Sequence, residues 1–259
     1  MGFFDSHCHL NDEKFENDYE NIILNAKSDN LEKLVVCGSD YETSKKAIEL
    51  AKKYENVYAI IGNHPENCNF YDDSIEIYYE TQSQLDKVVA IGEIGLDYHY
   101  GQETKEKQKE ILIKQLVLAD KVKLPVCIHL RDAYEDFLQI IETHKDLLKY
   151  GGVIHCYSGS YEYALIMLKY GFKLGLDGPL TFKNNRKAVE VVEKIPLENF
   201  VVETDCPYLA PEPVRGTRNE PKNVNYIVTK IASIKNMRID EVEDILLKNS
   251  YDLYKKMKR

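Results

Sequence analysis

"VVAIGEIGLDYHYGQETKEKQKEILIKQLVLADKVKLPVCIHLR" (88–131) predicts a strand, a helix and a second strand. The runs at 88–95 and 125–131 are short and apolar and contain β-branched residues, as buried strands do. Between them, the apolar side chains of residues 107–122 recur at i, i+3 and i+4, with lysines and glutamates opposite. A strand, a helix and a strand in this order indicate one unit of a parallel sheet.

The same alternation continues in both directions along the chain. Eight apolar runs are separated by amphipathic stretches, at 3–7, 33–39, 57–64, 88–95, 125–131, 151–159, 172–178 and 200–205. Eight such repeats predict an α/β fold, a (β/α)8 TIM barrel of the metallo-dependent hydrolase type, with a doubly wound open sheet as the competing fold. No Gly/Ser-rich or Pro-rich linker interrupts the chain, so we expect one domain over residues 1–259. The tail, 223–236 and 239–257, predicts two more helices.

Composition limits the classes of function. The net charge is −9, with 34 basic against 43 acidic residues, which argues against a broad basic face for nucleic acid. No apolar run approaches the roughly 20 residues of a membrane span, and no signal pattern opens the chain, so we expect a cytoplasmic monomer without membrane contact. Six cysteines without a C-x-x-C pair are expected to be reduced, buried thiols.

Histidines and acids follow the strands at one end. In "FFDSHCHL" (3–10), His7 and His9 alternate with other side chains, so both face the same side of a strand and can share a metal ion. Other candidates lie at or near the ends of later runs: Glu93, His129, His155 and Asp205. In a parallel barrel these ends form one rim, where active sites of this fold are built. A single strand-end histidine is more often structural, but the six residues together indicate a metal site.

Four histidines and two carboxylates suit two divalent cations, Mg²⁺, Mn²⁺ or Zn²⁺. Glu93 is the candidate bridge, because a carboxylate can give one oxygen to each cation and an imidazole cannot. Two such cations lower the pKa of a bound water and hold the attacking and leaving oxygens of a displacement. The reaction class predicted is therefore hydrolysis.

Seven blocks of the chain resemble the TatD-type metal-dependent nucleases of the amidohydrolase-like barrel group. They are "FDSHCHL" (4–10), "IGNHPE" (61–66), "GEIGLDY" (92–98), "IHLRDA" (128–133), "HCYSGS" (155–160), "ETDCPYLAP" (203–211) and "RGTRNEP" (215–221). The resemblance implies the same six metal ligands. It also implies a Mg²⁺-dependent 3′ to 5′ exonuclease or DNase acting on single-stranded or damaged DNA, sometimes RNA. Relatives that remove D-amino acids from tRNA keep a second activity open.

The predicted catalytic residues are Glu93, Asp205, Glu203 and His64. Asp205 is expected to hold one cation and accept the proton of the attacking water. Glu203 is two residues earlier and faces the same side, where it either supports the site from below or is a structural carboxylate of the barrel interior. His64 is expected to donate a hydrogen bond to a phosphate or reaction oxygen, with a structural role ahead of Pro65 as the alternative.

Substrate contacts are predicted from arginines and tyrosines near the rim. Arg131 is two residues beyond His129, and a guanidinium can clamp a phosphate with two parallel hydrogen bonds. Arg215 and Arg218 belong to a loop after the eighth strand that is basic in an acidic chain. Tyr98 is the candidate for stacking on an unpaired base, with Tyr157 as a second.

Three functions follow from these residues. The first is a phosphodiester hydrolase that shortens single-stranded DNA, or RNA, from the 3′ end, because an acidic chain lacks the surface to track a duplex. The second keeps the cations but hydrolyses an ester or amide such as D-aminoacyl-tRNA. The third is a metal-binding barrel that recruits a partner without catalysis. Alanine at Arg131 and Arg218 should remove most of the rate of the first activity and leave a small-ester hydrolase nearly unaffected.

Overall fold

Residues 2–100 and 102–257 are described by a computed structural model. Eight strands form one parallel sheet in which each strand pairs with its neighbours along the chain. The strands are β1 (Phe3–Cys8), β2 (Leu31–Cys37), β3 (Val57–Ile61), β4 (Val88–Asp97), β5 (Val126–Arg131), β6 (Gly152–Ile154), β7 (Phe172–Leu176) and β8 (Phe200–Val202). The predicted TIM barrel is confirmed, because a doubly wound sheet would reverse its strand order partway.

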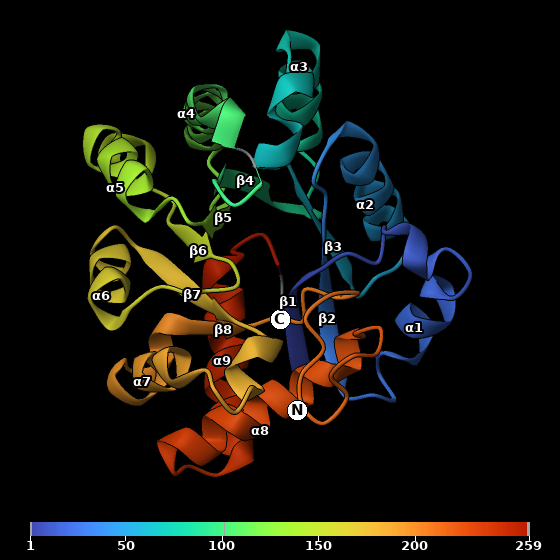
Figure 1. The fold of residues 1–259 in the computed structure, drawn as a ribbon. Coiled ribbons are helices and arrows are strands. Elements are labelled where there is room, and N and C mark those ends of the chain that lie inside the picture. Colours follow the sequence, from blue (N-terminus) through green and yellow to red (C-terminus); the bar gives the residue numbers. More distant parts are fainter. Residues whose placement is uncertain (1, 101, 258–259) are drawn as a thin grey trace.

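Helices surround the barrel, one after each strand (Figure 1). They are α1 (Tyr19–Asn25), α2 (Tyr41–Lys53), α3 (Asp73–Gln82), α4 (Lys105–Val122), α5 (Tyr134–Thr143), α6 (Tyr161–Lys169), α7 (Arg186–Lys194), α8 (Val224–Lys235) and α9 (Ile239–Leu253). Short 3-10 turns are η1 (Glu13–Phe15), η2 (Pro65–Phe70), η3 (Gln102–Thr104), η4 (Lys145–Leu147), η5 (Gly178–Thr181), η6 (Leu197–Asn199) and η7 (Pro221–Asn223). In the described part of the chain, no helix has the length and apolar character needed to cross a membrane.

Two strands are shorter than the apolar runs predicted. β6 ends at Ile154 instead of continuing to residue 159, and β8 ends at Val202 instead of residue 205. The backbone turns soon after each strand, where Cys156 has φ 47° and Asp205 has φ 55°. A residue whose backbone is in the left-handed region cannot continue a strand. The turns place the side chains that follow β6 and β8 at the rim.

Hydrogen bonds join β1 to the segment that follows β8. The Asp205 N–H donates to the carbonyl of His7 at 3.0 Å. Below this bond, the buried carboxylate of Asp5 accepts from the Thr204 N–H at 2.9 Å and from its hydroxyl at 2.6 Å. These contacts fix β1 against the segment after β8, so that the ends of the chain's first and last strands meet at one place.

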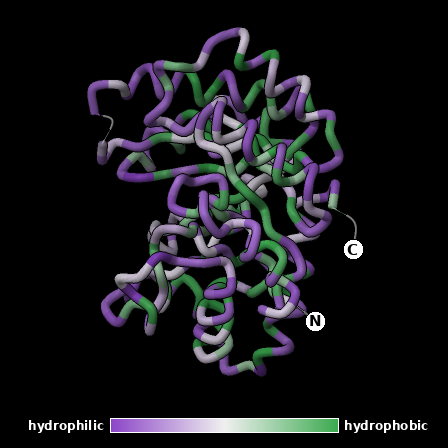
Figure 2. The backbone as a smooth tube through the Cα atoms, turned by 90° about the vertical axis from the view of Figure 1, so that its right-hand side faces the viewer, coloured by the Kyte–Doolittle hydropathy of each residue, from purple (hydrophilic) through white to green (hydrophobic). Residues whose placement is uncertain are grey.

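The apolar core has two parts. One lies between the strands and the surrounding helices, and its members alternate along the helices with polar residues, as the changing colours of the tube show (Figure 2). The other fills the barrel interior and includes Phe4, Tyr58, Ile60 and residues near the C-terminus. Tyr254 is fully buried there, and its hydroxyl donates to the carbonyl of Ser6 at 3.1 Å. The end of α9 and the residues after it therefore pack into the barrel interior.

Candidate metal centre and active site

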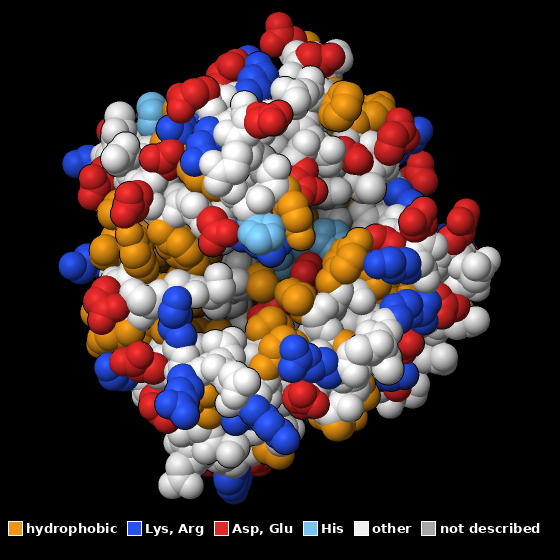
Figure 3. All heavy atoms as spheres, in the orientation of Figure 1, with side chains coloured by type: hydrophobic (Ala, Val, Ile, Leu, Met, Phe, Trp, Pro, Cys, Tyr) orange, Lys and Arg blue, Asp and Glu red, His pale blue; other side chains and the backbone are white. Residues whose placement is uncertain are grey.

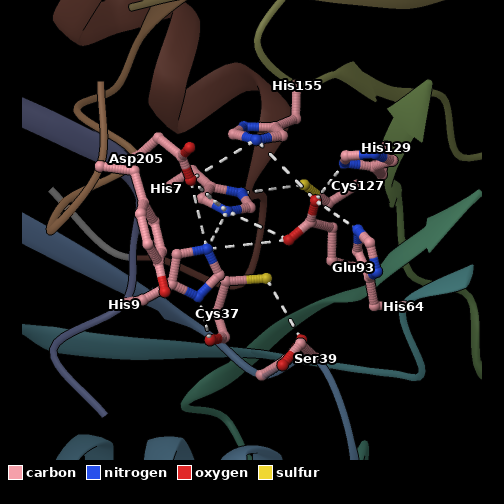
Figure 4. A network of polar contacts seen from close by, with 12 residues as sticks. His7, His9, Cys37, Ser39, His64, Glu93, Cys127, His129, His155 and Asp205 are labelled. Atoms are coloured by element: carbon pink, nitrogen blue, oxygen red, sulfur yellow. Dashed lines mark hydrogen bonds and ion pairs between the residues drawn. The ribbon is translucent and has the colours of Figure 1, made fainter. Parts of the chain in front are cut away.

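Six side chains meet at the carboxyl end of the strands (Figure 4). They come from five strands or from the residues directly after them: His7 and His9, Glu93, His129, His155 and Asp205. Nearly two hundred positions separate the first from the last. The parallel barrel brings together the complete ligand set that strand-end positions predicted.

Glu93 lies between two groups of imidazoles. Its Oε2 is 3.5 Å from Nε2 of His7 and 3.7 Å from Nε2 of His9. Its Oε1 is 2.8 Å from Nδ1 of His129 and 3.8 Å from Nε2 of His155. The two carboxylate oxygens therefore face different imidazoles, an arrangement suited to bridging two cations.

His7, His9 and Asp205 form the first group. The Nε2 atoms of His7 and His9 are 3.0 Å apart, and Oδ1 of Asp205 is 3.2 Å from Nε2 of His9. Nδ1 of His9 is 3.0 Å from the carbonyl oxygen of Cys37, which can only accept, so the proton is on Nδ1 and Nε2 offers a lone pair. Inward-facing lone pairs and a carboxylate at this spacing repel one another unless a cation or a proton lies between them. The donor set fits a metal cation.

His129 and His155 form the second group, and each has a carboxylate at its outer nitrogen. Nε2 of His129 is 3.0 Å from Oδ2 of Asp97. Nδ1 of His155 is 2.9 Å from Oε1 of Glu203, an ion-pair distance without the alignment of a hydrogen bond. Carboxylates hold the proton on the outer nitrogen of a ligating histidine and leave the inner nitrogen free for a cation. Both inner nitrogens face Glu93.

The charges of the cluster stabilise one another. Burial alone would raise the pKa of Glu93, but the positive charge of His155 and hydrogen bonds from His129 and His7 hold it well below its usual range. Burial would lower the pKa of His129, but hydrogen bonds to Asp97 and Glu93 raise it to about 9. A cation must therefore displace protons from the imidazoles, and its affinity should increase with pH.

Asp97 was missed by the sequence analysis. It is on β4, four residues beyond Glu93, and the alternation of a strand places both carboxylates on one face. Its Oδ1 accepts from the N–H groups of His99 at 2.8 Å and Tyr100 at 3.1 Å. Burial raises the pKa of Asp97, but hydrogen bonds, first that from His129, lower it to about 2. Asp97 lies within the motif "GEIGLDY" (92–98). The two-residue alternation of side chains along a strand is the signal that could have identified it.

Glycines allow the acids to approach the histidines. Gly95 has φ 151°, and a Cβ there would lie 1.8 Å from the carbonyl oxygen of His129. A Cβ at Gly175 on β7 would lie 2.3 Å from Oε1 of Glu203. Any larger residue would displace β5 in the first case and the carboxylate below His155 in the second.

Two buried thiols lie below His7. Sγ of Cys127 is 3.3 Å from Nδ1 of His7 and accepts the outward hydrogen bond of that imidazole (Figure 4). Burial raises the pKa of Cys127, but a hydrogen bond from Cys37 and the charge of His7 lower it to about 6. The cysteines are reduced and mostly buried, as predicted, but the supporting role of Cys127 had no signal in the sequence.

His64 lies beside the six residues and forms a close group with Glu93 and His129. It caps η2, where its Nδ1 accepts from the Glu66 N–H at 3.2 Å, so Nε2 carries the proton. Nε2 is 3.7 Å from Oε1 of Glu93. Burial, and then the positive charge of His129, lower the pKa of His64 to about 3. The imidazole stays neutral and directs an N–H toward the cluster.

The predicted substrate residues separate into two groups. Arg131 lines the cavity above the cluster, and no described carboxylate lies within ion-pair distance of it. Arg215 is half-exposed outside the cavity lining, 4.1 Å from the ring centroid of Phe182, with Glu212 at 3.8 Å. Only Arg131 of the two is placed to contact a substrate in this cavity.

Arg218 and Tyr98 are corrections to the sequence analysis. The guanidinium of Arg218 binds both oxygens of Asp18, at 2.6 and 3.0 Å, and Glu220 at 3.1 Å, and it does not line the cavity. Tyr98 is buried, and its hydroxyl donates to Asp136 at 2.7 Å. Arg218 fixes the loop after β8 to the segment before α1, and Tyr98 is not available for stacking.

The cluster is at the base of a cavity of about 660 Å³. Its walls include Arg131, Tyr100, Ser158 and Tyr208, and His9, His64 and Asp205 reach it from below. In Figure 3 the molecule is hollowed near the centre of the face toward the viewer, and histidine and acidic side chains are visible there. Glu203 is fully buried below His155 and has no access to the cavity.

Comparison with known proteins gives the family. The model of TatD-related DNases matches residues 4–255. The chain belongs to the TatD family. The uncharacterized metal-dependent hydrolase YabD of Bacillus subtilis is 42% identical over 252 residues, 97% of this chain and 98% of the relative. The uncharacterized metal-dependent hydrolase MJ1582 of Methanocaldococcus jannaschii is 34% identical, with 98% and 97% covered.

Solved TatD structures have the same fold. The crystal structure of YJJV, a TatD homologue from Escherichia coli K12, has a TM-score of 0.92 at 30% identity and covers 98% of each chain. The crystal structure of a TatD-family hydrolase from Entamoeba histolytica has a TM-score of 0.87 at 27% identity and covers 99% of each chain. The resemblance in the seven sequence blocks is thus confirmed over the length of the chain.

Proposed function

We propose that this TatD chain is a divalent-metal-dependent phosphodiesterase that removes nucleotides from the 3′ end of single-stranded DNA. One observation carries the proposal: Arg131, which has no described acidic partner, lines the same cavity as the Glu93 cluster. A guanidinium beside a two-cation site suits a phosphate better than a neutral ester. The family description as DNases supports DNA as the substrate, and the family resemblance supports the 3′ to 5′ direction.

Two cations are proposed, with Glu93 shared between them. His7, His9 and Asp205 would hold one, and His129 and His155 the other. Cations held there would lower the pKa of a bound water and stabilise the charge that develops on the phosphate oxygens. Zn²⁺ and Mn²⁺ suit the nitrogen-rich donor set, whereas Mg²⁺ prefers oxygen ligands and would exchange more readily.

Asp205 is the proposed general base. Its Oδ1 faces the imidazoles, 3.2 Å from His9 and 3.6 Å from His155, which leaves Oδ2 to accept the proton of the attacking water. Burial raises the pKa of Asp205, but the positive charge of His155, first among the opposing causes, lowers it below its usual value. The carboxylate is therefore ionised at neutral pH and able to accept a proton.

His64 and Arg131 are the proposed phosphate contacts. The fixed Nε2–H of His64 donates one hydrogen bond to a non-bridging phosphate oxygen near Glu93. Arg131 offers a planar pair of donors from the rim above. Both groups keep their charge state across the neutral range, because His64 remains neutral and a guanidinium remains protonated.

Hydrolysis of defined oligonucleotides tests the proposal. Metal-stripped protein is given Mg²⁺, Mn²⁺ or Zn²⁺ and a single-stranded DNA labelled at its 5′ end, with the matching blunt duplex and RNA strand as comparisons. Glu93→Gln, which keeps the shape of the side chain but weakens the bridge, is the matched control. We expect a ladder that shortens from the 3′ end and disappears in the Glu93→Gln protein.

The same preparation separates the alternative activity. Protein that binds metal but cleaves no oligonucleotide, and releases the amino acid from a D-aminoacyl-tRNA, would replace the nuclease proposal by an acyl hydrolase. Arg131→Ala sharpens the comparison, since phosphodiester hydrolysis should fall about 100-fold while hydrolysis of a small neutral ester should hardly change.

A further inference from the structure

Two tyrosines line the mouth of the cavity and are largely exposed. Tyr100, after β4, has 67% of its surface accessible, and Tyr208, after β8, has 44%. The other aromatic candidates near the rim, Tyr98 and Tyr157, are each only 5% exposed. Exposed aromatic rings beside a catalytic centre are suited to contact with a ligand rather than with the protein core.

Each exposed ring has a cation over it. The guanidinium carbon of Arg131 is 4.9 Å from the ring centroid of Tyr100, and Nζ of Lys14 is 4.4 Å from that of Tyr208. Among the described residues, no carboxylate lies within ion-pair distance of either cation. By contrast, Arg218 and Lys222, close to Tyr208 in sequence, are both paired with Glu220.

We propose that these two pairs, Tyr100 with Arg131 and Tyr208 with Lys14, are subsites for two unpaired nucleotides. In each pair the base stacks on the tyrosine ring and the adjacent phosphate contacts the cation. This inference rests on the proposed function, because it takes single-stranded nucleic acid as the substrate. It identifies which residues recognise the strand and explains how an acidic chain binds a polyanion.

The rings are held in place before a ligand binds. The hydroxyl of Tyr208 donates to Asp12 at 2.8 Å, and the ring meets His9 edge to face at 6.4 Å between centroids. Tyr100 packs edge to face against His99 at 4.5 Å. Binding therefore costs little side-chain conformational entropy, because the rings are already fixed, and a small entropy cost favours affinity. Because every base has a flat aromatic face, such stacking tolerates any sequence.

The elements that carry the pairs lie on different sides of the barrel. Tyr100 follows β4 and Arg131 ends β5, whereas Tyr208 follows β8 and Lys14 is in η1 (Figure 1). The cluster of Glu93 and Asp205 is at the base of the cavity whose mouth both tyrosines line. A strand that contacts both tyrosines would cross the mouth with a phosphodiester near the metal ligands.

Binding measurements with the full-length, Mg²⁺-loaded protein test the subsites. The probe is a fluorescein-labelled single-stranded DNA with phosphorothioate linkages at its 3′ end, which slow hydrolysis, and the readout is the dissociation constant from anisotropy. We expect Tyr100→Leu and Tyr208→Leu each to weaken binding by about 5- to 100-fold, the range of one base stacked on an aromatic ring. Tyr100→Phe keeps the ring and should bind within about twofold of wild type, and Tyr208→Phe, which keeps the ring but loses the hydrogen bond to Asp12, should lose much less affinity than Tyr208→Leu.

Two controls make the result specific. Tyr150, which lies between α5 and β6 and is 37% exposed, is outside the cavity lining, so Tyr150→Leu should leave affinity unchanged. An oligonucleotide of abasic sites keeps the phosphates and removes the bases. Wild type should bind it more weakly than normal DNA, and the tyrosine-to-leucine proteins should lose this preference.

The failures of the two proposals are distinguishable. If wild type hydrolyses and binds single-stranded DNA while both leucine variants bind as tightly as wild type, the subsites are wrong and the proposed function stands. An equal loss with normal and abasic DNA also contradicts base stacking. If wild type neither binds nor hydrolyses single-stranded DNA or RNA, both proposals fail together.

Discussion

At the scale of single residues, the site depends on what holds the outer nitrogen of each histidine. Asp97 holds His129, and the carbonyl of Cys37 holds His9. These partners accept hydrogen bonds and so keep the inner nitrogen unprotonated for a cation. The arrangement of acceptors around the ligands is therefore as important for metal binding as the ligands themselves.

Asp97→Asn should weaken metal binding about 10- to 100-fold. The amide can present an N–H to Nε2 of His129, which would move the proton to Nδ1, the nitrogen that faces Glu93. Competition with a coloured chelator measures the affinity for Mn²⁺ or Zn²⁺. Asp132→Asn is the matched control, since among the described residues that exposed carboxylate forms an ion pair with His99 alone, and its loss should leave the affinity unchanged.

The buried carboxyl group of Asp177, near the rim of the barrel, makes the stability of the fold depend on pH. It is buried, and its Oδ2 accepts from the thiol of Cys156 at 2.9 Å. Burial raises its pKa from 3.8 to about 7, with Glu203 and Asp205 adding to the rise. An acid whose pKa is raised on folding stabilises the fold less as pH increases from 3.8 to 7, because the folded state resists its ionisation.

Asp177→Asn should therefore stabilise metal-free protein at high pH and not at low pH. We expect a gain of roughly 1–3 kcal/mol in the free energy of unfolding at pH 8, decreasing toward zero near pH 4. Urea denaturation at a series of pH values measures it. An advantage that is constant with pH, or that grows as pH falls, would show that ionisation of Asp177 is not the cause.

The sequence predicted that the six candidate ligands converge because their signal is local and the parallel barrel brings strand ends together. A histidine or acid at the end of each strand needs no knowledge of distant contacts. The prediction that Arg218 contacts the substrate was wrong because its partner, Asp18, is 200 positions away and no local pattern indicates that contact. Cys127 and Tyr100 were missed for the same reason, since their roles arise from packing across the barrel.

At the scale of elements, the last helix contributes more than its position in the chain suggests. α9 was predicted as a terminal helix, and the structure confirms it. The sequence predicted this helix but not the surface against which it packs. The end of α9 packs beside Phe4, Tyr58 and other residues of the barrel interior, on a surface built by strands far away in sequence.

Tyr254→Ala should cost roughly 3–5 kcal/mol of stability, because it empties a fully buried site and leaves the carbonyl of Ser6 without its hydrogen bond. Urea denaturation of the metal-free protein measures the loss. Tyr150→Ala removes a side chain of the same size that is 37% exposed and should cost much less. Equal losses in the two variants would contradict the role given to the end of α9.

At the scale of the whole molecule, the proposed substrate contacts of this acidic chain are concentrated in one cavity. The net charge is −9, so the surface as a whole repels nucleic acid. Arg131 lines the cavity and Lys14 lies over the ring of Tyr208, and no described carboxylate is within ion-pair distance of either cation. The eightfold repeat predicted the fold, whereas the placement of these free charges depends on pairings that only the folded chain shows.

Binding of single-stranded DNA should therefore depend only weakly on salt. Two phosphate contacts give a slope of about −1.4 for log affinity against log salt concentration, at about −0.7 per contact on a single strand. Anisotropy titrations at several KCl concentrations measure the slope, and Lys14→Gln should reduce it by about half. A steep slope, typical of six or more contacts, would contradict a local binding site.

The most direct test of the account is a titration of metal-stripped protein with Mn²⁺, followed by electron paramagnetic resonance. The central claim is that the carboxylate of Glu93 joins two cation sites. We expect two Mn²⁺ ions per chain with a spin-coupled signal in wild type, and loss of the coupling in Glu93→Gln. A single bound ion, or two ions whose signals stay independent in wild type, would contradict the two-metal site and the hydrolytic mechanism built on it.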